Sequence, residues 1–125
     1  MLELRDLVLK PGAGPINHRL PGGRITVVLG RNHSGKSLFC RTLAGLADPV
    51  SGELRLEGES LAGVSPGERS VALVYQAFVN YPNWTVFQNI ASPLVAAGED
   101  KAEIERRVRD IAARLGLGDL LERHP

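Results

Sequence analysis

Apolar and polar residues alternate along several short segments in the first part of the chain. Residues 2–9 (LELRDLVL) predict a half-buried strand, residues 16–20 (INHRL) a short returning strand, and residues 51–60 (SGELRLEGES) a strand closed by a turn. Two further segments, 24–30 (RITVVLG) and 70–76 (SVALVYQ), are mainly apolar and β-branched, which is typical of strands buried in a parallel sheet.

Helical spacing marks two other segments, one between these strands and one after them. Residues 34–45 (SGKSLFCRTLAG) predict a helix that ends at Gly45, with Leu38, Thr42 and Ala44 at near-helical intervals. Within residues 84–90 (WTVFQNI), Thr85 and Gln88 have the spacing of a capping box. We therefore expect a second helix to begin there.

A third predicted helix has the clearest amphipathic pattern. Asp100 and Glu103 make a similar cap at its start, and Gly116 is expected to end it. Its apolar face is predicted to consist of Ile104, Val108, Ile111 and Leu115. The predicted order is strands, then a strand–loop–helix unit, then further strands and finally helices. This order is expected of an α/β domain with an antiparallel β annex.

Composition adds mainly exclusions to this picture. The chain has 125 residues, 43% hydrophobic and 23% charged, as expected of one modest globular domain or part of a larger one. A net charge of +1 gives no argument for nucleic-acid binding. The single cysteine, Cys40, excludes an intramolecular disulfide and fits a reducing compartment. Residues 1–20 show no secretion signal, and no stretch approaches the roughly 18 apolar residues that cross a bilayer.

A glycine-rich segment before the first predicted helix carries the chemistry. It matches G-x-x-x-x-G-K-[ST] with Gly30, Gly35, Lys36 and Ser37 at the fixed positions. Glycines let the backbone curl so that N–H groups point at phosphate oxygens, and the helix start adds its positive dipole end. Lys36 would bind the β- and γ-phosphates, and the Ser37 hydroxyl would bind Mg²⁺. An ordinary glycine-rich turn is the alternative, but the apolar segment before it and the helical pattern after it favour a phosphate site.

The predicted nucleotide-binding residues are Gly30, Arg31, Asn32, His33, Ser34, Gly35, Lys36, Ser37 and Leu38. Positions 31–33 are bulky and polar. We expect the His33 side chain to be solvated, with phosphate contact as the alternative.

Longer stretches resemble a known family. The phosphate segment, residues 44–61 (AGLADPVSGELRLEGESL) and residues 69–90 (RSVALVYQAFVNYPNWTVFQNI) together resemble the ATP-binding subunit of ABC transporters, in particular sugar and glycerol-type importers. The resemblance implies a P-loop NTPase core, with a partial parallel sheet and helices, plus the antiparallel β annex within residues 1–76 and the start of a helical subdomain in residues 77–125. It implies ATP and Mg²⁺ as ligands, and Gln76 as the Q-loop residue that contacts Mg²⁺ and the attacking water.

The resemblance also implies partners and a location. These are transmembrane permease subunits, a second ATP-binding subunit and, indirectly, a periplasmic or extracellular solute-binding protein. The chain would lie in the cytoplasm, peripheral on the inner face of the cell membrane, and drive solute import. Tyr81, Pro82 and Trp84 would lie where the helical subdomain receives the coupling helix of the permease, although a buried core position for Trp84 is an equal alternative.

Two features depart from the family pattern. The family stacks adenine on an aromatic residue near the position of Pro11, but no aromatic residue precedes Phe39, so weak base discrimination is expected. The family's signature, its catalytic carboxylates and its switch histidine follow the segment LLERHP (120–125) and are not in this sequence. Residues 1–125 are therefore expected to bind ATP without hydrolysing it, and the predicted strand 24–30 is expected to lack its sheet neighbours.

Two other functions remain open at this point. One is a stand-alone nucleotide-binding or regulatory module that does not hydrolyse. The other is a soluble P-loop kinase or GTPase, which the lack of a second acidic motif and of a guanine-reading N-K-x-D makes less favoured.

Overall fold

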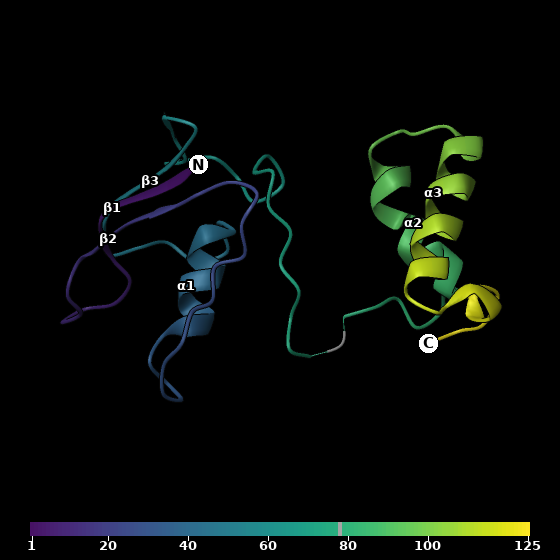
Figure 1. Cartoon of the computed structure of the whole chain (residues 1–125), viewed down its shortest axis with the longest axis horizontal. Helices are drawn as coiled ribbons and strands as arrows, with labels where there is room; N and C mark the ends of the chain where they lie inside the picture. The colour runs from purple at the N-terminus through teal and green to yellow at the C-terminus, as the bar shows by residue number, and fades with distance from the viewer. Residues whose placement is uncertain (78) are drawn as a thin grey trace. The chain divides into compact units, whose positions relative to one another are not determined.

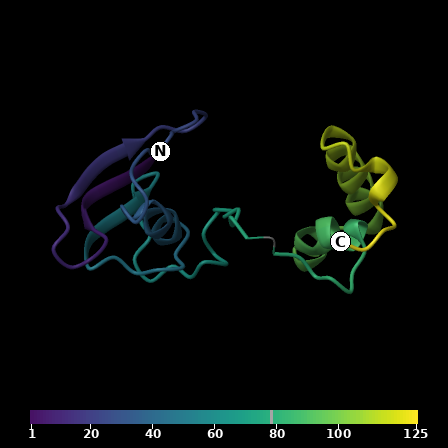
Figure 2. The ribbon, with the colours of Figure 1, turned by 90° about the horizontal axis from the view of Figure 1, so that it is seen from below.

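The chain forms two compact units in its computed structural model, which describes residues 1–77 and 79–125 (Figures 1 and 2). We call Met1–Val74 the loop–sheet unit and Tyr75–Pro125 the helical unit. Each has its own buried core. Position 78, within the stretch 69–90 that carries the resemblance, lies outside the described residues.

The loop–sheet unit is built on an antiparallel sheet. Its strands are β1 (Leu2–Val8), β2 (Ile16–Leu20), β3 (Ser51–Leu56) and β4 (Glu59–Ser60), in the order β2-β1-β3-β4. Leu4 of β1 lies opposite Leu54 of β3, and both leucines are buried. The predicted strands at 2–9, 16–20 and 51–60 are confirmed, the last of them as the hairpin β3–β4.

One helix covers the apolar face of this sheet. The core residues Leu4, Leu7, Leu54 and Leu61 pack against Phe39 and Leu43 of α1 (Lys36–Leu43), which lies beside the sheet in both views (Figures 1 and 2). The predicted helix 34–45 is therefore confirmed in its central part. Gly45, with a φ of 77°, follows the last turn and ends it as predicted.

The predicted strands 24–30 and 70–76 are wrong for this structure. Neither segment is a strand or makes ladder hydrogen bonds to other described residues. Most of their apolar side chains are exposed, with Ile25 at 95%, Leu29 at 87% and Val74 at 93% of full accessibility. The apolar pattern identified residues suited to a buried strand, but a strand forms only beside a partner, and the four strands of the sheet pair with one another.

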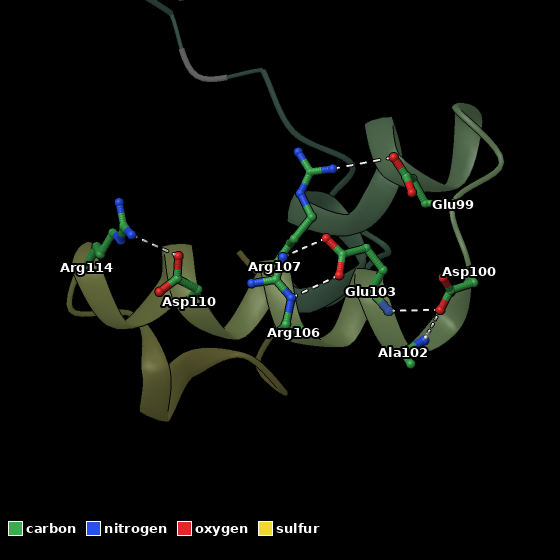
Figure 3. Close-up of polar contacts among 8 residues, drawn as sticks. All are labelled: Glu99, Asp100, Ala102, Glu103, Arg106, Arg107, Asp110 and Arg114. Atoms are coloured by element: carbon green, nitrogen blue, oxygen red, sulfur yellow. Dashed lines mark hydrogen bonds and ion pairs between the residues drawn. The ribbon is translucent and has the colours of Figure 1, made fainter.

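The helical unit contains two helices that begin at side-chain caps. In α2 (Val86–Ala96), Thr85 Oγ1 accepts from the Gln88 N–H at 3.2 Å and Gln88 Oε1 accepts from the Thr85 N–H at 2.8 Å. The predicted capping box is thus confirmed. In α3 (Lys101–Arg114), Asp100 Oδ1 accepts from the N–H groups of Ala102 and Glu103 at 2.9 and 3.0 Å (Figure 3).

Glu103, predicted to complete the cap of α3 together with Asp100, makes a different contact. The Glu103 carboxylate accepts two hydrogen bonds from Arg106, one turn further on, at 2.6 and 2.9 Å (Figure 3). This pairing is available because residues three apart lie side by side on a helix. The Asp100 side chain alone therefore caps α3, and the expected reciprocal bond from Glu103 is not formed.

The buried face of α3 is rotated from the prediction. Ile104 and Val108 are buried as expected, but Ala112 is fully buried while Ile111 and Leu115 are 40% and 62% exposed. After α3 the chain turns back through the 3₁₀ segment η1 (Gly118–Leu120), and Leu117 and Leu121 pack into the same core. They cover the side of α3 that carries Ala112, which leaves the other edge in solvent.

Candidate functional site

The phosphate segment is a tight turn followed directly by α1. The Ser34 N–H donates to Arg31 O at 3.2 Å, and His33 and Gly35 have left-handed φ values of 65° and 102°. Such a value is costly for most residues but not for glycine, which explains the need for Gly35. At Gly30 an added Cβ would lie 2.7 Å from Ser34 Oγ, so a larger residue would displace the Ser34 side chain.

The start of α1 is open to an anion. Gly35 is the N-cap and provides no side-chain cap, and the first turn holds no acidic residue. The first N–H groups of a helix have no partner within it, and at this end they carry the positive end of the dipole. Lys36, Ser37 and Leu38 supply these N–H groups, which is the arrangement that binds phosphate elsewhere.

Lys36 keeps its ammonium group inside the turn. Its Nζ donates to Gly30 O at 2.7 Å and to Arg31 O at 2.9 Å, and the side chain is half-buried. These contacts fix the charge at the concave side of the turn, close to the open helix start. The predicted residues from Gly30 to Leu38 are therefore brought together, and their donors fit the phosphates of a nucleotide.

The Ser37 hydroxyl is the protein group that could hold Mg²⁺ here. Ser37 is exposed on the first turn of α1. The described residues contain no group of three His, Cys, Asp or Glu side chains placed to bind a metal. Mg²⁺ is commonly held by one or two protein ligands together with phosphate oxygens and water, so the Ser37 hydroxyl would be one ligand among several.

The other predicted site residues belong to the helical unit. Gln76 is the second residue of this unit and is exposed, and its assignment as a Q-loop residue stays a prediction. Tyr81 and Trp84 stack with ring centroids 4.3 Å apart, and they remain 56% and 41% exposed. The alternative of a buried core position for Trp84 is therefore wrong. His33 is exposed in the turn of the loop–sheet unit, as expected.

Asn89 holds this aromatic pair in place. Its Oδ1 accepts from the Tyr81 N–H at 2.7 Å, and its Nδ2 donates to the carbonyl oxygens of Tyr81 and Trp84 at 3.0 and 3.2 Å. Sequence reasoning did not single out Asn89, because a polar residue in the first turns of a helix normally reads as solvated. The pair forms one wall of a groove of about 850 Å³ whose apolar lining includes Phe87, Ala91, Val95 and Ile104.

No helix in the two described ranges is both long and apolar enough to span a bilayer. The helical unit instead carries charges on its surface as ion pairs. Figure 3 shows Arg106–Glu103 and Arg114–Asp110 in α3, and Arg107 reaching Glu99 before the helix. A further pair in α3 is Arg109–Glu105.

Known proteins are similar to this chain in sequence over most of its length. Residues 14–125 match the ABC transporter family. The maltose/maltodextrin import ATP-binding protein of Yersinia pestis is 40% identical over 110 residues, or 88% of this chain and 30% of the relative. The sn-glycerol-3-phosphate import ATP-binding protein of Chromohalobacter salexigens is 44% identical over 103 residues, covering 82% and 28%.

A third relative is an import ATP-binding protein for another sugar. The trehalose import ATP-binding protein of Mycobacterium tuberculosis is 39% identical over 110 residues, covering 88% of this chain and 28% of its own. The chain thus spans less than a third of the length of these relatives. With a phosphate loop at the start of a sheet-backed helix and a family match over residues 14–125, this chain belongs to the ABC transporter family.

Proposed function

We propose that the chain binds MgATP through residues 30–38 as part of an ABC import ATPase. The observation that carries the proposal is the uncapped start of α1, with the Lys36 ammonium held 2.7 Å from Gly30 O on the concave side of the turn. The N–H groups of the first turn would bind phosphate oxygens, Lys36 would neutralise their charge, and Ser37 would bind Mg²⁺. Bound Mg²⁺ would offset the charge of the phosphates.

Gln76 is proposed as the residue that orients water and Mg²⁺ in the whole protein. The support is its place at the end of the segment 70–76, after the apolar residues VALVY, and before Tyr81, as the resemblance to the family implies. Because this residue lies outside the phosphate turn, its loss is expected to affect turnover by the whole protein more than nucleotide binding by this chain.

The whole protein is proposed to power import of a sugar, a glycerol phosphate or a related solute. The support is the function named for the relatives, which are maltose/maltodextrin, sn-glycerol-3-phosphate and trehalose import ATP-binding proteins. Its partners would be permease subunits, a second ATP-binding subunit and, through the permease, a solute-binding protein. The chain would lie at the cytoplasmic face of the membrane, with the groove beside Tyr81 and Trp84 receiving the permease.

The test is a titration of a fluorescent ATP analogue with Mg²⁺ into the wild-type chain and Lys36→Ala. Loss of the fixed cation should weaken binding by at least about tenfold, since hydrogen bonds to charged groups are the strong ones. Alanine favours helix, so the fold should be kept. Arg41→Ala is the matched control, because Arg41 is an exposed cation at the far end of the same helix. Equal affinities for the wild-type chain and Lys36→Ala would remove the proposal.

A further inference from the structure

Arg69 binds four backbone carbonyl groups with one guanidinium. Nη1 donates to Thr42 O and Leu43 O, both at 3.2 Å, Nη2 donates to Leu61 O at 3.1 Å, and Nε donates to Val64 O at 3.1 Å. The side chain is half-buried in the loop–sheet unit. It therefore joins the end of α1 to the loop that follows the sheet.

Two of these carbonyls are the last ones of α1. The chain leaves the helix with the Gly45 N–H donating to Thr42 O at 3.1 Å and the Leu46 N–H to Arg41 O at 2.8 Å, which is a Schellman motif. In this motif no backbone N–H of the described residues donates to Leu43 O, and the Arg69 guanidinium donates to it instead. A cation here also faces the negative end of the helix dipole.

Gly45 makes room for this contact. A Cβ at this position would lie 2.7 Å from Arg69 Nε, and its φ of 77° also disfavours other residues. The sequence thus places a glycine where both the helix end and the guanidinium require one. Arg69 is the first residue of the stretch 69–90, which also contains Gln76.

The opposite end of α1 is the phosphate turn. The helix has eight residues, so its ends are only about 11 Å apart and a shift at one end moves the other. The segment 24–30 that enters the turn has no ladder hydrogen bonds to other described residues, so it does not hold the turn in place. Within the loop–sheet unit, the position of Lys36 and Ser37 depends on α1, and α1 is held by Phe39, Leu43 and Arg69.

We propose that Arg69 is a positioning residue for the phosphate turn: it anchors the far end of α1 and thereby fixes the N–H groups and the Lys36 cation that face a nucleotide. The inference rests on the proposed function for its ligand. Arg69 itself does not reach the nucleotide, since its guanidinium donates to carbonyl groups at the far end of α1 and in the loop that follows the sheet.

The experiment compares Arg69→Met, Arg69→Lys and the control Arg41→Met with the wild-type chain. Arg41→Met removes a cation from the same end of α1, where no side-chain bond of Arg41 is found among the described residues. Two quantities are measured: amide hydrogen exchange of residues 36–43 without nucleotide, and the dissociation constant of the ATP analogue, corrected for the folded fraction by circular dichroism.

Arg69→Met is expected to speed amide exchange in α1 by about tenfold. It should also raise the dissociation constant of the ATP analogue for folded molecules by about tenfold, which corresponds to about 1.4 kcal/mol. Exchange in the helical unit and both quantities in Arg41→Met should stay within about twofold of wild type. Arg69→Lys keeps the charge but cannot span four carbonyls, so it should fall between.

Unchanged exchange in α1, or an unchanged dissociation constant for folded Arg69→Met, would overturn the proposal. A purely structural role would lower the folded fraction without changing the affinity of the molecules that remain folded. If Arg69→Met does not fold, Arg69→Lys provides the test. Wild-type exchange in α1 and a wild-type dissociation constant for Arg69→Lys would then overturn the proposal. If the wild-type chain does not bind the analogue, the proposed function fails, while the exchange in α1 still tests the anchor.

Discussion

The resemblance to the family implies an aromatic residue against adenine near the position of Pro11, but no Tyr, Phe or Trp precedes Phe39. Loss of one base–aromatic stack costs about 1–3 kcal/mol, or roughly ten- to a hundredfold in affinity. Binding would then depend on phosphate contacts, which ATP and GTP share. We predict dissociation constants for ATP and GTP within about tenfold of each other in a competition assay.

A strong preference for ATP would contradict this prediction. It would indicate that another side chain packs against adenine. His18, exposed on β2, is the residue to replace first, and His18→Ala should then remove the preference.

Glu3 is a buried carboxylate among arginines. It lies opposite Arg19 of β2 and Arg55 of β3, and the hydrogen bond from Arg5, at 2.7 Å, is the main reason that its pKa lies below the ordinary value. Arg19 and the other cations lower the pKa further, while burial opposes them. A lowered folded pKa means that the unfolded chain binds the proton more tightly, so this carboxylate stabilises the fold at neutral pH and its contribution is lost in acid.

We predict that Glu3→Gln lowers the free energy of unfolding at pH 7 and that this difference shrinks as the pH falls below the ordinary value of 4.5. Other acidic groups also titrate there, so the informative quantity is the wild-type value minus the Glu3→Gln value. Denaturant unfolding followed by circular dichroism at several pH values measures it. A difference that does not change with pH would show that Glu3 is not held ionised by the arginines.

At the scale of elements, α2 contains a proline that should interrupt it. Pro93 has no N–H to donate to the carbonyl of Asn89, which lies four residues earlier. The Ser92 hydroxyl donates to Asn89 O at 2.9 Å instead. The helix therefore keeps this carbonyl satisfied and continues to Ala96.

We predict that Ser92→Ala destabilises the helical unit by about 1 kcal/mol, the net value of one hydrogen bond. In a Pro93→Ala background the backbone regains its N–H, so the same substitution should cost less than about half as much. Fluorescence of Trp84, the single tryptophan, reports unfolding of this unit. Equal costs in both backgrounds would show that Ser92 does not compensate for Pro93.

The elements that could be predicted from sequence are those whose causes are local. Thr85 and Asp100 cap helices through contacts within three residues, and Gly45 ends α1 through its own φ. The strands predicted at 24–30 and 70–76 were wrong because strand hydrogen bonds depend on a neighbouring strand that no local pattern specifies. The burial of Ala112 in place of Ile111 likewise depended on where the chain returns after α3.

The candidate site divides in the same way. The turn from Gly30 to Leu38 is contiguous, so its motif predicted which residues the structure brings together. Asn89 and Arg69 were missed because their partners are backbone groups of other segments, up to 27 residues away for Arg69. A residue-type pattern does not specify such partners.

At the scale of the whole molecule, the carboxylates decide whether a bound nucleotide can be cleaved. In the helical unit Glu99, Glu103, Glu105 and Asp110 pair with arginines and Asp100 caps α3; Figure 3 shows these contacts except the Glu105 pair. Within the described ranges no three acidic, histidine or cysteine side chains gather at a metal-binding distance. Phosphoryl transfer needs a second group to hold Mg²⁺ and one to orient water, in addition to Lys36 and Ser37.

We therefore predict that a polypeptide of residues 1–125 binds MgATP without turning it over. Phosphate release with MgATP should equal that of Lys36→Ala, since positioning of the phosphates alone does not orient water. Adding a second polypeptide that carries the region of the relatives beyond the match should give Lys36-dependent release if that region supplies the carboxylates. Lys36-dependent release by residues 1–125 alone would contradict the prediction. It would mean that the exposed acids, including those paired with arginines on α3, form a complete site once nucleotide is bound.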